Sequence, residues 1–266
     1  MKSILKIFVV LLLCLTLAAC QEKTDPPAVS VPTSETTASM TPNVTPSEPP
    51  SEEPAEVESG LAEYQAALRQ IVSEHIYPDG TDTGFDSSFG SMEDNQFALC
   101  DVTGDGADEL IVQFTTAPMA GNTETIYAFQ QADGTLKELL TASPNLTYYA
   151  NGIIKEDWSH GSELASEGYW PYTLYQYNAA EDSFEELAQV NMWSKAVADV
   201  DFKGDPYPDD IDAEGAGTVF ILGSSNEVKT VSKSDYEQWL ADTMGTAVEL
   251  DIPYQALNEE NIEALN

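Results

Sequence analysis

The stretch FALCDVTGDGADELIVQF, residues 97–114, contains two apolar runs and one acidic loop. The apolar runs are residues 97–100 and 110–114, and the loop between them is rich in Asp and Gly. Short apolar runs bounded by Asp and Gly are typical of strands joined by a turn. The stretch therefore predicts two neighbouring strands with an acidic loop between them.

Similar pairs of apolar runs follow along the chain at short intervals. Asn151-Gly152 joins one pair, and Asn-Gly between apolar runs is a strong signal for a hairpin. The predicted pairs are residues 125–129 with 135–140, 146–150 with 153–157, 172–177 with 184–190, and 218–222 with 227–230. Successive hairpins with short turns predict an antiparallel meander.

Helices are predicted on either side of this β-rich region. Apolar residues recur at three- and four-residue steps over residues 61–76, which is the spacing of one helix face. Ser232 or Ser234 can cap a second helix that stops at Gly245, and Asn258 can cap a short last helix. The predicted fold class is α+β: an antiparallel β-meander of successive hairpins with an N-terminal helix and one or two C-terminal helices.

The acidic loop carries oxygen-bearing side chains at alternate positions. Calcium binds six to eight oxygen atoms, and a tight loop can supply them where a Gly permits the sharp turn. We expect one calcium ion here, with Gly106 at the turn and water completing the coordination shell. The expected ligands are the side chains of Asp101, Thr103, Asp105 and Glu109 and the backbone carbonyl of Ala107.

The loop differs from an EF-hand, because Val112 stands at the twelfth position and a strand rather than a helix follows. It resembles the D-x-[DN]-x-[DN]-G-x-x-[DE] calcium loop of FG-GAP and VCBS repeats, in a single copy. It departs from that pattern at Thr103, which removes one formal charge. A metal-free turn closed by Asx hydrogen bonds is the alternative.

Residues 1–19 have the features of a signal peptide. Lys2 and Lys6 precede an apolar run that is short for a bilayer-spanning helix, and small residues follow it. The ending Leu17-Ala18-Ala19-Cys20 resembles the lipobox of bacterial lipoproteins. That resemblance implies lipidation of Cys20 and a lipid anchor on the outer, extracytoplasmic face of the cell membrane. The alternative is an ordinary secretory signal that is cut nearby.

Residues 20–60 predict a disordered linker after the lipidated Cys20. Half of residues 21–60 are Pro, Ser or Thr, and every aromatic residue except Phe8 lies after residue 60. Such a segment cannot form a hydrophobic core. Residues 61–266 are therefore the predicted globular domain, in which Cys100, as the single cysteine, cannot form an intramolecular disulfide.

The charge of the chain excludes one class of partner. There are 46 Asp and Glu residues against 10 Lys and Arg, a formal net charge of -36. Nucleic-acid binding needs cationic side chains for the phosphates, so we expect no nucleic-acid partner. Anionic lipid headgroups repel the same surface, although the predicted anchor attaches the chain to a membrane.

Residues 158–177 form an aromatic-rich segment. Trp158, His160, Trp170 and Tyr172 could line a ligand cleft, with His160 as its polar group. The alternative is that the aromatic residues pack the sheet while His160 lies in a surface loop.

A second acidic cluster lies between Asp199 and Asp212. Its alternating carboxylates could hold another cation. Lys203, Pro206 and Pro208 interrupt the carboxylates, and a solvated acidic loop is the favoured alternative.

A longer resemblance accompanies these motifs. Residues 97–101 with the loop, residues 148–153, 158–160 and 170–178 look like the globular part of uncharacterised lipoproteins from clostridia and related gut Firmicutes. This resemblance implies a cell-surface location and carries no established activity.

The predicted function is that of a membrane-anchored extracytoplasmic lipoprotein with a calcium-binding domain that binds a protein or glycan ligand. The sequence contains none of the common catalytic motifs, which favours a binding role over an enzyme. The alternatives are a cell-surface hydrolase acting on glycans and a purely structural envelope protein.

Overall fold

The computed structural model describes residues 60–158, 169–201, 203–224 and 227–265. The chain divides into two units, Met1–Glu53 and Pro54–Asn266, and all described residues belong to the second. The predicted signal peptide, Cys20, the linker up to residue 59 and His160 lie outside the described residues.

The stretch at residues 97–114 forms the predicted pair of strands. Strand β1 (Gln96–Cys100) pairs antiparallel with β2 (Glu109–Phe114), and Leu99 lies opposite Leu110. In β2, every residue except Gln113 is buried, because this strand lies in the middle of its sheet and both of its faces are covered.

A five-stranded antiparallel sheet is built around this pair in the order β11-β1-β2-β3-β4. Its other members are β3 (Thr123–Gln130), β4 (Thr135–Ala142) and β11 (Gln255–Ala256). The short strand β11 comes from the C-terminal segment and pairs with β1 at the edge, a pairing that the sequence did not predict. Short 3-10 helices, Met92–Asp94 and Met119–Gly121, precede β1 and β3.

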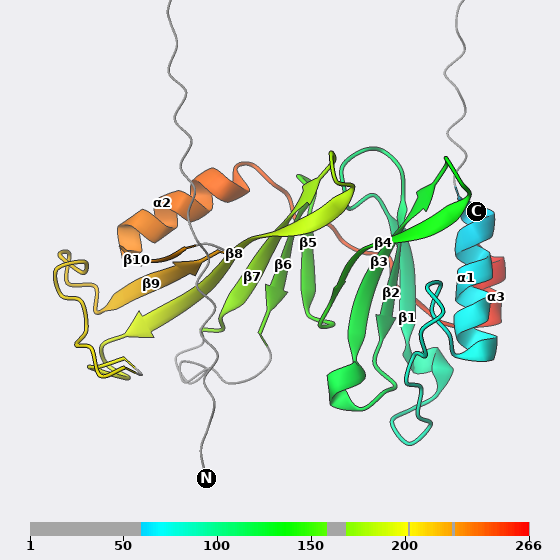
Figure 1. The fold of residues 1–266 in the computed structure, drawn as a ribbon, viewed down its shortest axis with the longest axis horizontal. Helices are drawn as coiled ribbons and strands as arrows, with labels where there is room; N and C mark the ends of the chain where they lie inside the picture. The colour runs from blue at the N-terminus through cyan, green and yellow to red at the C-terminus, as the bar shows by residue number, and fades with distance from the viewer. Residues whose placement is uncertain (1–59, 159–168, 202, 225–226, 266) are drawn as a thin grey trace, which may run out of the picture. The chain divides into compact units, whose positions relative to one another are not determined.

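A six-stranded antiparallel sheet has the order β10-β9-β8-β7-β6-β5, which is the chain order read backwards. Its members are β5 (Leu146–Tyr149), β6 (Ile153–Asp157), β7 (Tyr172–Asn178), β8 (Ser183–Ser194), β9 (Thr218–Gly223) and β10 (Val228–Ser232). This sheet is the meander of hairpins that the turn signals predict, and Figure 1 shows its strands side by side.

Helices cover the outer faces of the two sheets. Helix α1 (Leu61–Glu74) packs on the five-stranded sheet together with α3 (Glu259–Glu263), and Arg69 of α1 forms an ion pair with Glu259. Helix α2 (Lys233–Met244) packs on the six-stranded sheet through Tyr236 and Trp239. The predicted α+β class, with an antiparallel meander, an N-terminal helix and C-terminal helices, is confirmed.

The inner faces of the two sheets share a hydrophobic core. Ile111 and Ile126 from the five-stranded sheet pack with Tyr148 and Ile154 from the six-stranded sheet. At this junction the fully buried Glu124 of β3 accepts a hydrogen bond of 2.5 Å from the Tyr148 hydroxyl. A second hydroxyl, from Tyr254 in the C-terminal segment, donates to the same Glu124 oxygen, so one carboxylate connects three parts of the fold.

The helix ends follow the predicted caps, with one difference. Ser232 and Asn258 cap α2 and α3 by accepting hydrogen bonds from backbone amides. Helix α1 ends at Glu74, before the end of its apolar pattern, because His75 adopts a left-handed conformation (φ 59°). The His75 ring packs on the Phe85 ring, with 4.6 Å between the ring centroids.

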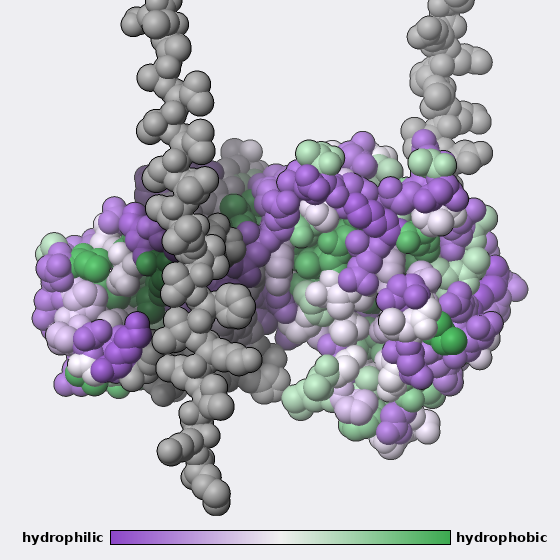
Figure 2. All heavy atoms as spheres, in the orientation of Figure 1, coloured by the Kyte–Doolittle hydropathy of each residue, from purple (hydrophilic) through white to green (hydrophobic). Residues whose placement is uncertain are grey.

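One face of the molecule shows how hydrophilic and hydrophobic residues are distributed on the surface. Figure 2 shows hydrophilic residues over most of the visible face, with hydrophobic residues visible between them.

Among the described residues, no helix combines the length and the hydrophobicity needed to cross a membrane.

Candidate functional site

The loop between β1 and β2 is held by its own acidic side chains. Asp101 accepts hydrogen bonds from the backbone amides of Gly104, at 2.6 Å, and Gly106, at 2.9 Å. Both glycines have positive φ angles, 82° and 92°, which L side chains rarely adopt. Asp105 accepts a hydrogen bond of 2.8 Å from the amide of Ala107. The loop forms locally because the carboxylates of Asp101 and Asp105 accept hydrogen bonds from backbone amides a few residues further along the chain.

Glu109 closes the other end of the loop. Its side chain is only 3% exposed, and one carboxylate oxygen accepts hydrogen bonds from the amides of Val102, at 2.9 Å, and Thr103, at 3.2 Å. Burial, together with the nearby negative charges of Asp105 and Asp101, raises the pKa of Glu109 to about 8, despite those hydrogen bonds. The loop thus holds a buried carboxyl group that stays protonated up to about pH 8.

The predicted calcium ligands lie in this one loop, and their geometry can be compared with the needs of a cation. In the part of the chain that the structure describes, no three His, Cys, Asp or Glu side chains are arranged to hold a metal ion. The Asx hydrogen bonds of a metal-free turn are present. Each carboxylate nevertheless keeps acceptor capacity, since two oxygens offer about four lone-pair positions and the loop uses one at Asp105, two at Asp101 and three at Glu109. The residue types therefore fit calcium, and binding it requires the side chains to converge further.

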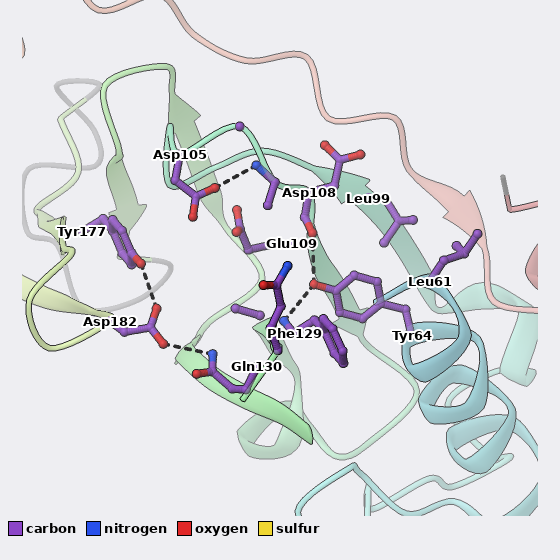
Figure 3. Close-up of a pocket in the computed structure, with 14 residues that line it drawn as sticks. Leu61, Tyr64, Leu99, Asp105, Asp108, Glu109, Phe129, Gln130, Tyr177 and Asp182 are labelled. Atoms are coloured by element: carbon purple, nitrogen blue, oxygen red, sulfur yellow. Dashed lines mark hydrogen bonds between the residues drawn. The ribbon is translucent and has the colours of Figure 1, made fainter. Parts of the chain in front are cut away.

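A cavity of about 400 Å³ lies beside this loop. Figure 3 shows its lining, which comes from the loop, from α1, from the end of β3 and from the β7–β8 turn. The lining residues are Leu61, Tyr64, Leu99, Asp105, Gly106, Ala107, Asp108, Glu109, Ala128, Phe129, Gln130, Gln131, Tyr177 and Asp182. The predicted calcium loop is thus one wall of a cavity large enough for a small molecule.

Hydrogen bonds fix the walls of the cavity. Asp182 accepts from the Tyr177 hydroxyl at 2.8 Å and from the Gln130 side chain at 3.0 Å, as Figure 3 shows. Tyr64 donates to the backbone carbonyl of Asp108 at 3.0 Å and accepts from the amide of Phe129 at 3.0 Å. These bonds connect helix α1, the loop and strand β3 around one space.

The aromatic-rich segment is divided between the two faces of the six-stranded sheet. Tyr172 is buried, and its hydroxyl shares a hydrogen bond of 2.8 Å with the hydroxyl of Tyr236 on α2. Trp158 donates to the hydroxyl of Thr173 at 3.2 Å, so it lies on the opposite face, since neighbouring strand residues point to opposite sides. Trp170 is 40% exposed, and His160 lies outside the described residues. The structure does not bring Trp158 and Tyr172 into one cleft.

The second acidic cluster consists of turns closed by its own carboxylates. Asp201 accepts hydrogen bonds of 2.8 Å from two backbone amides of its own turn. Asp212 is buried and accepts from the Tyr207 hydroxyl and from two further amides. Lys195 lies 2.5 Å from a carboxylate oxygen of Asp209. These contacts involve protein groups on the carboxylates of Asp201, Asp209 and Asp212.

The cavity also includes residues that the sequence did not mark as functional. Tyr177 and Asp182 belong to the β7–β8 hairpin, and Leu61 belongs to the first turn of α1. No local spacing connects them to the loop, because the sheets bring them together only in three dimensions. Cys100 is a half-buried free thiol, and burial raises its pKa, which fits a packing role better than a reactive one.

Comparison with known proteins found no matching family model, no matching curated protein and no matching solved structure.

Proposed function

We propose that the protein is a lipid-anchored extracytoplasmic binding module whose loop at residues 101–109 binds one calcium ion. The observation that carries this proposal is the concentration of carboxylates in one loop: Asp101, Asp105 and Glu109 all accept hydrogen bonds from amides of the loop itself. Hard oxygen ligands of this kind suit calcium. The proposed anchor is supported by the lipobox-like sequence ending at Cys20.

Calcium would act on this loop in two ways. It would offset the repulsion among three carboxylates, one of which is buried. It would also stabilise the loop as a wall of the neighbouring cavity, to which Asp105 and Glu109 both contribute. The binding role therefore belongs to the cavity, and the proposed metal supports its shape.

Thermal unfolding with calcium and with a chelator tests the metal. Calcium at about a hundred times its dissociation constant adds about 2.7 kcal/mol of stability to a protein that binds it only when folded. For a domain of this size, that corresponds to a rise in Tm of about 5 to 10 °C. Asp101→Asn should lose most of this rise, because it removes one ligand charge.

The matched control is Asp133→Asn, which removes the same charge in the β3–β4 turn and should keep the full rise. Equal melting in millimolar calcium and in chelator would refute the metal site. So would a calcium response of Asp101→Asn equal to that of the unmutated chain.

A further inference from the structure

The cavity beside the loop has an acidic part and an apolar part. The acidic part contains Asp105, Asp108 and Glu109 from the loop region and Asp182 from the β7–β8 turn. The apolar part contains Leu61, Leu99 and Phe129. Figure 3 shows Leu61 and Leu99 on the side of α1, and Asp105 and Asp182 on the side of Tyr177.

The charge of the lining selects the kind of ligand. Among the described residues that line the cavity, none is basic, and four are carboxylic acids. Such a surface repels anionic ligands and raises the local concentration of cations. A volume of about 400 Å³ fits a small organic molecule.

We propose that this cavity binds a small organic amine, with its ammonium group near Asp105 and Asp182 and its apolar body against Leu61, Leu99 and Phe129. This inference goes beyond the proposed calcium site and does not depend on it.

Asp182 is held in place by its neighbours. The Tyr177 hydroxyl and the Gln130 amide donate to its two different oxygens, and Lys137 lies 3.3 Å from one of them. A carboxylate fixed in this way loses little freedom when a ligand binds, which favours affinity. The Tyr177 ring also lines the cavity, where an ammonium group could make a cation–π contact.

The amine site and the proposed calcium site share one residue and differ in others. Asp105 belongs to both, so a variant of Asp105 would affect both. Asp101 is an expected calcium ligand that does not line the cavity, and Asp182 lines the cavity but lies outside the loop. Variants of Asp101 and Asp182 can therefore separate the two sites.

Isothermal titration calorimetry tests the inference. The full chain, in detergent and with a chelator present, is titrated with 2-phenylethylamine and, separately, with its neutral analogue 2-phenylethanol. We expect the amine to bind at least about tenfold more tightly than the alcohol, because only the amine forms charge-assisted hydrogen bonds. Asp182→Asn should weaken amine binding about tenfold and should keep an acceptor for Tyr177. Glu227→Gln removes the same charge at an exposed position in the β9–β10 turn, and it should change the affinity for the amine by less than about twofold.

The outcomes also separate this inference from the proposed function. Asp101→Asn should lose the calcium response and keep amine binding. Three results would each overturn the amine site while leaving a calcium response intact: equal binding of amine and alcohol, no detectable binding of the amine, or amine binding by Asp182→Asn equal to that of the unmutated chain. The comparison of the two ligands uses the unmutated chain, so it decides the matter even if Asp182→Asn fails to fold.

Discussion

At the scale of single residues, Glu109 combines burial with a raised pKa. Its carboxyl is buried, and burial and neighbouring carboxylates raise its pKa from 4.5 to about 8. The folded protein therefore holds this proton between about pH 4.5 and 8, whereas the unfolded chain releases it. The contribution of Glu109 to the free energy of unfolding is therefore fully present below about pH 4.5 and is lost as the pH rises towards 8.

This linkage gives a measurable pH dependence. In chelator, the free energy of unfolding should fall between pH 5.5 and 8 with a contribution from Glu109 of up to about 1.4 kcal/mol per pH unit. Denaturant titrations at several pH values measure it. Glu109→Gln keeps an acceptor for the amides of Val102 and Thr103 and cannot titrate, so its slope should be smaller. Identical slopes for the two proteins would contradict the assigned pKa.

At the scale of elements, the β5–β6 hairpin turn packs against the acidic loop. Gly152 has φ 72°, and a Cβ atom there would lie 3.0 Å from the carbonyl oxygen of Thr103. Gly134, in the β3–β4 turn, has φ 69° and nothing within 4 Å of the same position. The two glycines therefore share a backbone conformation and differ in their surroundings.

Alanine substitutions at these two glycines separate strain from contact. Gly134→Ala should cost about 1 to 2 kcal/mol, the penalty of a left-handed conformation. Gly152→Ala should cost about 1 kcal/mol more, because its methyl group pushes against the loop backbone. Chemical unfolding measures both, and equal losses would mean that the turn and the loop are not coupled.

The elements also show which features can be predicted from sequence. The hairpin at Asn151-Gly152 was predictable because Gly152 supplies the left-handed residue of its turn, although the turn has three residues, since Tyr149 pairs with Ile153 and Ala150 belongs to it. Strand β11 was not, because two residues carry no periodicity and their pairing depends on β1, far away in the chain. The cavity was missed for the same reason: Tyr177 and Asp182 reach the loop only after both sheets have formed. The loop itself was predictable as a turn, since Asp101 bonds to amides within five residues.

At the scale of the whole molecule, the net charge of -36 bears on how the chain could be held at a membrane. Anionic headgroups repel such a chain, so electrostatic attraction cannot hold it there. The lipid on Cys20 that we propose would supply the attachment that the charge does not. Acyl chains contribute about 0.8 kcal/mol for each buried CH₂ group, and two chains are enough for stable anchoring.

Replacing the proposed lipidation site tests this at the same scale. Cys20→Ser should move the protein from the membrane fraction to the soluble or secreted fraction, because it removes the thiol that would carry the lipid. Cys14→Ser is the matched control: it lies within the predicted signal peptide and should leave the protein in a membrane fraction that resists washing with high salt. Fractionation followed by immunoblotting measures both. If Cys20→Ser stays with the membrane, a lipid on Cys20 is not what holds the chain there. If the unmutated chain is already soluble, the ordinary secretory signal is the better interpretation.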